Sequence, residues 1–503
     1  MKATKEPKEP KQAKQRRKLR VMLALFEASP FLKTGGLGDV GGSLPGALKR
    51  VGIDARAVLP KFKTIPEQYK AKMKFVTSFY VPLGWRNQYC GVWELKWDGT
   101  VYYFLDNEYY FLRDRAYGYY DDGERVAFFS KAVCEFLQYL PDFKCDVLHC
   151  NDWHTALAPV FLREFYRGIP LYDNIKTVFT IHNLKFQGMM SDFVLGDILG
   201  LYGIPAAENQ LRATKDAVNF MMGGLCYSDI LTTVSPTYAE EIKSEYYGEH
   251  MEGIFRRRSD VLYGILNGIN LNEYDPATDP ALPARYTMDD LSGKAVCKEN
   301  IQKEFGLPVR PEVPLVTLIS RLTEQKGLDL LDAVLEELLD QDIQLVVLGT
   351  GDPAYENELK RVASHRPNMA AAIYFSEELS RRLYAGADIL LMPSKFEPCG
   401  LSQMIAMHYG TLPIVRMTGG LTDSVVPYNK FTGEGTGFRF MNYNAHELLF
   451  TVKEAADICR NRPKDWKKLM LQAMAYDVSW EKSAKEYKAI YHKLHPEVTP
   501  YSK

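Results

Sequence analysis

Two basic residues stand five positions apart in the segment SRLTEQKG, residues 320–327. Arg321 can donate forked hydrogen bonds to a phosphate group, and Lys326 adds a compact positive charge. When a bond to a diphosphate breaks, negative charge grows on the diphosphate, and two such cations can stabilise it in place of a metal ion. The segment separates an aliphatic run at 315–319 from a leucine-spaced helical pattern at 328–338. We therefore expect both cations at the carboxyl edge of a parallel sheet, where such folds bind ligands.

A second segment, SKFEPCGLSQ at 394–403, follows another aliphatic run and opens a helix. Glu397 lies in this short loop. Phosphate would repel its carboxylate, whereas sugar hydroxyls can donate hydrogen bonds to it. Backbone N–H groups where the helix begins can bind a second phosphate, and they belong to Gly400, Leu401 and Ser402.

A glycine-rich stretch, KTGGLGDVGGSLPGAL at 33–48, follows the first predicted strand. It contains the G-x-G-x-x-G spacing of dinucleotide-binding folds, with Asp54 downstream, so a nicotinamide-dependent dehydrogenase is one alternative. The strand ends near Glu27, however, and the glycines begin eight residues later, whereas the dinucleotide fingerprint lies directly on the turn after the strand. The longer loop favours an anion site made by glycine N–H groups, the charge of Lys33 and a helix that begins near Val40. A glycine turn without a ligand is the remaining alternative.

The elements that must position these residues alternate as βα units. Short aliphatic runs and longer amphipathic stretches follow one another through the first half of the chain, and the alternation begins again at 315–319. This pattern predicts an α/β protein with two doubly wound, Rossmann-like domains. Predicted strands lie at 20–26, 146–151, 177–181, 230–234, 315–319, 344–348 and 389–392.

The predicted domains follow from where this alternation breaks. We expect a disordered basic tail at 1–19, an N-terminal domain at 20–267, a C-terminal domain at 268–475 and, at 476–503, a helix that returns to the N-terminal domain. The boundary is placed at Asn267-Gly268, where several prolines follow. Since open α/β sheets bind ligands beyond the carboxyl ends of their strands, the site is expected in a cleft across which the two domains face each other.

Composition narrows the setting in which the protein works. Its 503 residues carry a formal net charge of −1, although nine Lys or Arg and only two Glu fall within the first 20 residues. No apolar run approaches the ~18 residues of a membrane span, so no membrane partner is expected. The eight cysteines are scattered without a C-x-x-C pair, which indicates reduced thiols in the cytoplasm, or in a plastid if the source is photosynthetic. The one D-x-D pattern, at 340–342, falls in a turn, so no metal ion is expected. No other cofactor and no nucleic-acid partner are expected either.

Six separated motifs point to a known family, because they occur in that family's order and spacing. Residues 20–490 resemble the bacterial glycogen synthases and plant starch synthases, which are retaining glucosyltransferases of the GT-B fold. The motifs are KTGGLGDV (33–40), CNDWHTAL (150–157), FTIHNLKFQG (179–188), ISRLTEQKG (319–327), FEPCGLSQ (396–403) and TGGLTDSV (418–425).

The resemblance implies transfer of glucose from a nucleotide sugar to the non-reducing-end 4-hydroxyl of an α-1,4-glucan, with the acceptor on the N-terminal domain and the donor on the C-terminal domain. The donor is usually ADP-glucose, and UDP-glucose is the alternative. The implied catalytic residues are His182, Arg321, Lys326 and Glu397. The implied donor-binding residues are Lys33, Gly35, Gly36, Asp39, Phe375, Gly400, Leu401 and Ser402. The implied acceptor-binding residues are Asp152 and Asn183.

Two positions depart from the family's pattern. Phe375 stands near the nucleotide base where the family often has Tyr, and Ser402 stands where Thr is common. A catalytically silent glucan-binding relative is a further alternative, but such a chain should have lost part of the site, and all the implied charged residues are present. Cys399 is expected to pack beside the site rather than to act as a nucleophile. Since no carboxylate pair matches that of retaining glycosidases, the resemblance implies front-face displacement, with the leaving phosphate helping to deprotonate the acceptor.

Overall fold

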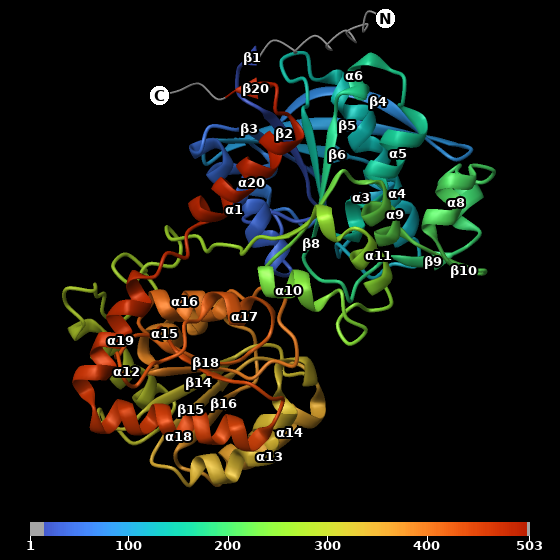
Figure 1. The fold of residues 1–503 in the computed structure, drawn as a ribbon. Coiled ribbons are helices and arrows are strands. Elements are labelled where there is room, and N and C mark those ends of the chain that lie inside the picture. Colours follow the sequence, from blue (N-terminus) through green and yellow to red (C-terminus); the bar gives the residue numbers. More distant parts are fainter. Residues whose placement is uncertain (1–14, 500–503) are drawn as a thin grey trace, which may run out of the picture. The chain divides into compact units, whose positions relative to one another are not determined.

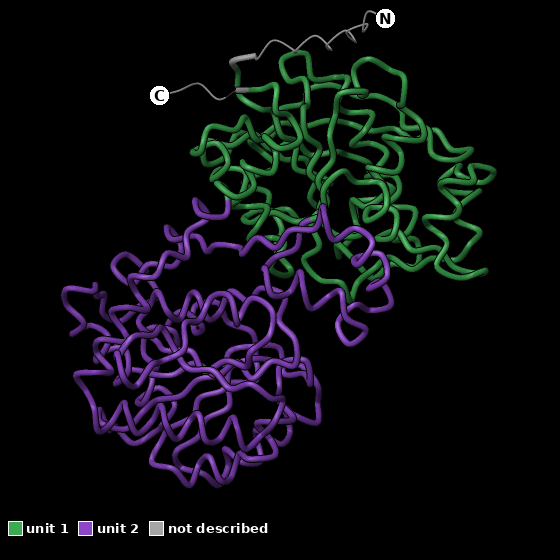
Figure 2. Tube along the Cα trace, viewed as in Figure 1, with its two compact units in different colours: residues 1–231, 484–503 green, residues 232–483 purple. Residues whose placement is uncertain are grey.

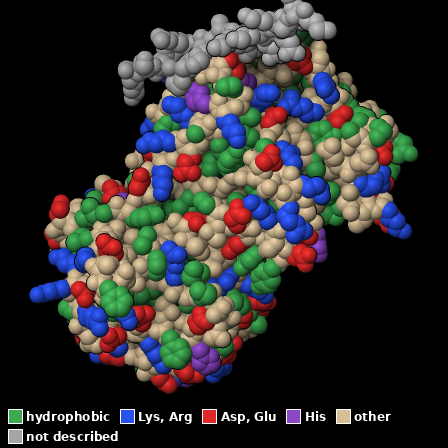
Figure 3. Space-filling model, viewed as in Figure 1, with side chains coloured by type: hydrophobic (Ala, Val, Ile, Leu, Met, Phe, Trp, Pro, Cys, Tyr) green, Lys and Arg blue, Asp and Glu red, His purple; other side chains and the backbone are tan. Residues whose placement is uncertain are grey.

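The chain forms two compact units in a computed structural model that describes residues 15–499. Unit 1 comprises residues 1–231 and 484–503, and unit 2 comprises residues 232–483 (Figure 2). Each unit is built on its own sheet, which is mixed in unit 1 and wholly parallel in unit 2. Within 15–499, no helix combines the length and the apolar character needed to cross a membrane. On the face shown in Figure 3, acidic and basic side chains are interspersed rather than gathered by sign.

The sheet of unit 1 contains parallel strands in the order β8-β7-β2-β3-β6 and continues through the antiparallel strands β5 and β4 (Figure 1). These strands are β2 (Arg20–Ala24), β3 (Asp54–Pro60), β4 (Lys74–Leu83), β5 (Arg86–Trp97), β6 (Thr100–Asp106), β7 (Val147–Asn151) and β8 (Lys176–Ile181). Every residue of β7 is buried, as expected for a central parallel strand with helices on both faces. The predicted strands at 20–26, 146–151 and 177–181 are therefore confirmed.

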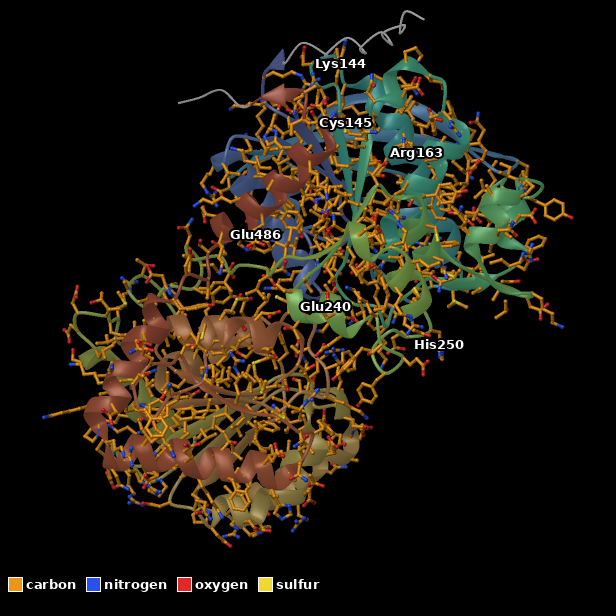
Figure 4. All side chains as sticks on the ribbon, viewed as in Figure 1. Lys144, Cys145, Arg163, Glu240, His250 and Glu486 are labelled. Atoms are coloured by element: carbon orange, nitrogen blue, oxygen red, sulfur yellow. The ribbon has the colours of Figure 1, made fainter. Side chains whose placement is uncertain are left out.

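Helices cover both faces of this sheet. Figure 1 shows α1 and α20 on one side of it and α4, α5 and α9 on the other. On α5, Arg163 (labelled in Figure 4) donates to Asp229 at 2.8 Å, and the same carboxylate accepts the backbone N–H of Thr177 in β8 at 2.7 Å, which ties the helix to the sheet. The helices of this unit are α1 (Gly36–Arg50), α2 (Glu67–Lys70), α3 (Glu108–Phe111), α4 (Asp122–Phe136), α5 (Leu157–Phe165), α6 (Pro170–Asp173), α7 (Val194–Asp197), α8 (Pro205–Leu211), α9 (Phe220–Tyr227) and most of α20 (Trp480–Leu494). A small antiparallel sheet adds β9 (Met189–Ser191), β10 (Arg212–Thr214) and β11 (Ala217–Asn219).

The sheet of unit 2 is wholly parallel, in the order β16-β15-β14-β17-β18-β19. Its strands are β14 (Leu315–Ile319), β15 (Gln344–Leu348), β16 (Met369–Ala372), β17 (Ile389–Met392), β18 (Leu412–Arg416) and β19 (Phe438–Phe440). The predicted strands at 315–319, 344–348 and 389–392 match these limits. The main helices are α12 (Ser292–Glu304), α13 (Leu328–Leu339), α14 (Pro353–Ala363), α15 (Glu377–Gly386), α16 (Ser402–His408), α17 (Gly419–Ser424), α18 (Ala445–Asn461) and α19 (Pro463–Ala475).

Several short elements follow α9 in the sequence. They are β12 (Ile230–Thr233), α10 (Pro236–Glu241), α11 (Glu252–Arg257) and β13 (Leu262–Gly264). The division into compact units falls within β12, whereas the predicted domain boundary lies at residue 267. The compact units are defined by their contacts and the predicted domains by sequence pattern, so the predicted limits stay a prediction.

The two ends of the described chain lie together. Residues 1–14 of the predicted disordered tail lie outside the described residues, but residues 15–16 form β1 (Gln15–Arg16), which pairs in parallel with β20 (Val498–Thr499). Arg17 then forms an ion pair with Asp146 at 2.6 Å, and Leu19 is buried. The last residues of the predicted tail therefore take part in the fold.

A buried lysine stabilises unit 2. Lys294 of α12 is 7% exposed, and its three N–H groups are shared among four acceptors that lie 2.9 to 3.1 Å from Nζ. Three of these are backbone carbonyls and one is a hydroxyl: Ala385, Ala387, Tyr409 and Thr411. The ammonium group thus links α12 to the loops that precede β17 and β18.

We expect Lys294→Met to lower the free energy of unfolding by about 2 kcal/mol, because an apolar side chain of similar length leaves buried acceptors without their donor. Urea unfolding at neutral pH measures the change. The matched control is Lys303→Met on the same helix, where the side chain is 62% exposed. Equal stability of the two variants would show that the four hydrogen bonds add nothing.

Candidate active site

The two loops that follow β14 and β17 bring a cation and a carboxylate together in unit 2. Lys326 Nζ lies 2.5 Å from Glu397 Oε2, and Ser394 Oγ donates to the same oxygen at 3.2 Å. Because β14 and β17 are parallel neighbours, the loops after them emerge at the same sheet edge. Glu397 is only 8% exposed, so the pair is held in a largely desolvated place. The sequence prediction placed Lys326 and Glu397 at this edge, and the structure brings their charged groups into contact.

Gly327 allows the two loops to approach this closely. It has φ +77°, and a Cβ atom there would lie 2.2 Å from the carbonyl oxygen of Pro393. A side chain is therefore excluded both by the left-handed backbone and by the neighbouring loop. The glycine fixes Lys326, the residue before it, against the segment that carries Glu397.

Arg321 lies in the same loop as Lys326 but faces solvent. Its guanidinium donates one long hydrogen bond, 3.4 Å, to Gln325 Oε1. It forms no ion pair with any residue in 15–499. An exposed guanidinium without a carboxylate partner keeps its full charge for an anionic ligand.

The start of α16 supplies backbone N–H groups on the same edge of unit 2. Gly400 has φ +75°, and Leu401 caps the helix without a side-chain acceptor for the first N–H groups. The Ser402 hydroxyl hydrogen-bonds to Tyr384, which partly offsets the effect of burial that raises the pKa of Tyr384 to about 12. Burial also raises the pKa of the Cys399 thiol to about 12. Cys399 is thus a protonated, packed side chain at neutral pH, as predicted.

Phe375 lies apart from these charged groups. It follows β16 in the loop before α15, and its ring is 86% exposed. The loops after β14, β16 and β17 all leave the carboxyl edge of one sheet. The predicted contact of Phe375 with a nucleotide base stays a prediction, although an exposed ring on this edge can stack on a base.

In unit 1 the glycine loop begins α1 directly. The helix starts at Gly36, whereas the sequence predicted a start near Val40, so that prediction was wrong. The low helix propensity of glycine is overridden here by close packing. A Cβ atom would lie 2.3 Å from the Glu27 carbonyl oxygen at Gly41 and 2.5 Å from that of Ser29 at Gly42.

Two glycines of the same loop are not explained by packing. A Cβ atom at Gly35 or Gly36 would meet no atom of the described chain within 4 Å, and neither residue has a positive φ. Nearby, Lys33 Nζ pairs with Asp39 Oδ1 at 2.7 Å across the first turn of α1. The protein itself therefore leaves room above Gly35 and Gly36, beside a lysine and a helix N-terminus.

The ends of β7 and β8 carry the remaining predicted residues. Asp152 Oδ1 accepts the backbone N–H of His182 at 2.7 Å and that of Asn183 at 3.4 Å. Asp152 has φ +56° and ψ 179°, a backbone conformation that costs about 1–3 kcal/mol in a residue other than glycine. The strain is consistent with a site in which the position of this carboxylate matters.

Burial sets the protonation of these groups. It lowers the pKa of His182 to about 3, so the imidazole is neutral at physiological pH. Burial raises the pKa of Asp152 to about 7. The two backbone N–H groups that donate to its carboxylate oppose this shift, because they lower the pKa. His182 is therefore neither a cation nor a proton carrier near pH 7, whereas Asp152 titrates there.

Comparison with known proteins identifies the family. Residues 20–257 match the starch synthase catalytic domain, and residues 299–468 match the glycosyl transferases group 1. The glycogen synthase of Desulfitobacterium hafniense is 51% identical over 478 residues, which cover 95% of this chain and 99% of the relative. That of Geobacillus stearothermophilus is 50% identical over 477 residues, covering 95% and 98%. The chain belongs to the glycogen synthase and starch synthase family.

Solved structures agree with this membership. The catalytic domain of starch synthase IV from Arabidopsis thaliana, bound to ADP and acarbose, is 32% identical, with a TM-score of 0.86 over 95% of this chain and 99% of that chain. The sucrose-phosphate synthase of Thermosynechococcus elongatus, 18% identical with a TM-score of 0.58 over 95% of this chain and 100% of its own, shares the fold. The prediction of a GT-B fold with two Rossmann-like sheets is confirmed, and the protein is a glycosyltransferase.

Glu27 and Tyr117 of this glycogen synthase relative were not among the predicted site residues. The Glu27 carboxylate accepts the Thr34 backbone N–H at 2.6 Å, the Thr34 hydroxyl at 2.6 Å and the Tyr117 hydroxyl at 2.5 Å. Its charge also contributes to the raised pKa of Asp152. An acidic residue shortly after β2 was a usable signal, because it falls at the carboxyl edge. No sequence pattern marks Tyr117.

The raised pKa of Asp152 predicts a pH dependence. We expect kcat/KM for the glucan to fall as the pH drops below about 7, because protonation removes the carboxylate that can accept a sugar hydroxyl. Asp152→Asn should be less active and should lose this acid limb. Initial rates between pH 5.5 and 8.5, roughly one to two units either side of the pKa, measure both. If kcat/KM of Asp152→Asn still falls at low pH as in the wild type, the pH dependence belongs to another group.

The same raised pKa makes the folded protein more stable at low pH, where the activity is expected to fall. The folded-state pKa of about 7 lies above the ordinary aspartate pKa of 3.8, so the folded protein binds the proton more tightly than the unfolded chain. This residue therefore contributes stability at low pH that is lost as the pH rises towards 7. A loss of activity below pH 7 that is reversible, without unfolding, separates the two effects.

Proposed function

We propose that this protein transfers glucose from ADP-glucose to the non-reducing-end 4-hydroxyl of an α-1,4-glucan with retention of configuration. UDP-glucose is the alternative donor. The contact between Lys326 and Glu397 carries the proposal, because a cation of the kind that binds phosphate lies beside a carboxylate that can accept sugar hydroxyls. Membership of the family and the likeness to a starch synthase solved with ADP and acarbose support the choice of substrates.

The residues of unit 2 divide the donor between them. Arg321 and Lys326 bind the diphosphate, and backbone N–H groups at Gly400, Leu401 and Ser402 bind it from the start of α16. Glu397 Oε2 is engaged by Lys326 and Ser394, so Oε1 is the oxygen that accepts a glucose hydroxyl. The cations then stabilise the charge that grows on the leaving nucleoside diphosphate. Phe375 stacks on the base.

Lys33, Gly35, Gly36 and Asp39 of unit 1 take part in donor binding as well. The support is the unfilled space at the two glycines, where no atom of the described chain excludes a side chain. A bound phosphate that approaches the backbone N–H groups would itself exclude a Cβ atom.

We expect Gly36→Ala to raise the KM for the donor about tenfold or more, since the added methyl group occupies the space of the ligand. Its stability should be unchanged or slightly higher, because Ala favours a helix over Gly. Gly42→Ala should instead reduce stability, because its Cβ atom would lie 2.5 Å from a backbone oxygen. Donor kinetics and thermal unfolding of both variants are the measurements. A normal KM in Gly36→Ala would remove this loop from the donor site.

Asp152, His182 and Asn183 hold the transferred sugar and the acceptor. No pair of carboxylates is assigned as nucleophile and acid, so front-face displacement is the reaction that we propose. In it the departing phosphate oxygen takes the proton of the attacking 4-hydroxyl as the glucose–phosphate bond breaks. The Arg321 and Lys326 charges lower the cost of that step.

One assay tests the proposal directly. Purified protein is given a maltodextrin with either labelled ADP-glucose or labelled UDP-glucose, and incorporation into the polymer is followed. We expect incorporation from ADP-glucose to dominate. An α-1,4-specific glucosidase should then release the labelled glucose from the polymer, which establishes that the α configuration of the donor is retained. Failure of transfer from both donors would contradict the function, and dominance of UDP-glucose would contradict only the donor.

We infer that the reaction takes place in the cytoplasm, or in the plastid of a photosynthetic cell. Buried thiols such as Cys145 (labelled in Figure 4) and Cys150 support a reducing compartment. Fractionation of the source cells with an antibody against the protein tests this. Recovery from an oxidising, extracytoplasmic fraction would contradict it.

A further inference from the structure

The side chain of Asn151 is held in a single orientation at the end of β7. It is fully buried, and its Nδ2 donates to the carbonyl of Ala24 in β2 at 3.2 Å and to that of His149 at 3.3 Å. Both amide hydrogens are thus directed at backbone oxygens. The amide oxygen faces the other way, where His182 Nε2 lies 2.9 Å from it.

This contact decides which imidazole nitrogen carries the hydrogen. An amide oxygen accepts hydrogen bonds and cannot donate them, so the nitrogen that faces it must be a donor. The ring of His182 is neutral, because burial lowers its pKa to about 3, and it therefore carries one hydrogen. That hydrogen lies on Nε2, which leaves Nδ1 with a lone pair that can accept a hydrogen bond.

We propose that Asn151 is a positioning residue that holds His182 in the Nε2-protonated tautomer, so that Nδ1 accepts a hydrogen bond from a hydroxyl of the transferred sugar. The identity of the ligand rests on the proposed function, whereas the tautomer rests on the contacts of Asn151 alone. His182 then acts as a neutral acceptor and exchanges no proton in the reaction.

Neighbouring contacts keep both partners in place. The backbone N–H of Asn151 donates to Thr155 Oγ1 at 2.5 Å, and that of His182 donates to Asp152 Oδ1 at 2.7 Å. The ring of His149, which contributes to neither contact, has its two nitrogens 2.8 Å from Tyr491 Oη and 2.6 Å from Thr180 Oγ1. Rotation of the Asn151 amide would replace two N–H···O contacts with oxygen facing oxygen. The alternative tautomer of His182 is therefore disfavoured by several groups at once.

Nitrogen NMR of the protein with 15N-labelled histidine tests the tautomer without turnover. His182→Gln assigns the signals, and the wild-type ring should show a protonated Nε2 and an unprotonated Nδ1. Asn151→Ser removes the amide oxygen that can only accept a hydrogen bond, so the signals should move towards a mixture of tautomers. A wild-type ring protonated on Nδ1, or an unchanged ring in Asn151→Ser, would overturn the proposal. Because no substrate is needed, this result stands whether or not the proposed reaction is correct.

Kinetics with modified donors test the consequence. The probes are deoxyglucose forms of the nucleotide sugar, each lacking one hydroxyl. Wild-type protein should discriminate against the analogue that lacks the hydroxyl bound by Nδ1. Asn151→Ser should lose roughly 10- to 100-fold in kcat/KM for the complete donor, the range seen for groups that orient a ligand through another side chain. It should also lose most of that discrimination.

A matched control separates positioning from loss of structure. Asn368 in unit 2 also donates from Nδ2 to two backbone carbonyls, those of Leu339 at 2.9 Å and Ile343 at 3.0 Å. It lies at the amino end of β16, away from the carboxyl edge that carries the site. Asn368→Ser should keep the wild-type discrimination between analogues. An equal loss of rate for every analogue in Asn151→Ser would mean that Asn151 is only structural, and the proposal would fail.

Discussion

Lys326→Ala should lower kcat roughly 100- to 1,000-fold at saturating donor, the loss typical of a group that stabilises charge in the transition state. The ammonium group lies 2.5 Å from Glu397. In the proposed reaction it stabilises the charge that grows on the leaving diphosphate. The donor KM should change much less than kcat, because the interaction strengthens as the bond breaks. Steady-state rates with ADP-glucose and a maltodextrin measure both constants.

The control for this experiment must allow for stability. Removal of Lys326 leaves the Glu397 carboxylate, which is 8% exposed, without its cation, and a broken buried pair is costly. Rates should therefore be compared well below the unfolding temperature of each variant. Lys303→Ala removes a surface lysine that pairs with Glu299 in α12, and it should keep the wild-type rate. Near-normal turnover of folded Lys326→Ala would exclude the residue from the mechanism.

Glu397→Gln should lower kcat/KM roughly 100-fold, since the substitution keeps the shape but removes the charge that pairs with Lys326 and that, in the proposed function, accepts a sugar hydroxyl. The hydrogen bond from Ser394 can still form to the amide oxygen. Both donor affinity and turnover should therefore fall. Isothermal titration with ADP-glucose, without acceptor, separates the loss of binding from the loss of rate.

The double variant Lys326→Ala/Glu397→Gln gives the sharper outcome. If the two residues act as one unit, its loss should be far smaller than the product of the two single losses. Glu358→Gln, on the surface of α14 and paired with Arg361, is the matched control. Multiplicative losses would show that Glu397 binds the sugar independently of Lys326.

The sequence was sufficient for the family and the fold. Aliphatic runs predicted the strands of both sheets, because a parallel strand covered on both faces must be apolar along its whole length. The motifs that follow those strands placed Arg321, Lys326 and Glu397 at a carboxyl edge. The contact between Lys326 and Glu397, 71 residues apart, then follows from the adjacency of β14 and β17.

Local reasoning failed where packing opposes propensity. The glycines of the first loop predicted a late helix start, yet α1 begins at Gly36, since Gly41 and Gly42 pack against backbone oxygens where no side chain fits. The contact of Glu27 with Tyr117 could not be predicted, because the two residues lie 90 positions apart and no sequence pattern links them.

The sequence by itself determined which residues gather at each sheet edge, because strand order and motif position follow from apolar patterning and from the family. Only the tertiary structure decided their chemical states. The pKa of Asp152 near 7, the neutral ring of His182 and the hydrogen on its Nε2 all arise from burial and from partners on other strands. The unfolded chain has neither this burial nor these partners, since desolvation and hydrogen-bond geometry are created only when β2, β7 and β8 lie side by side.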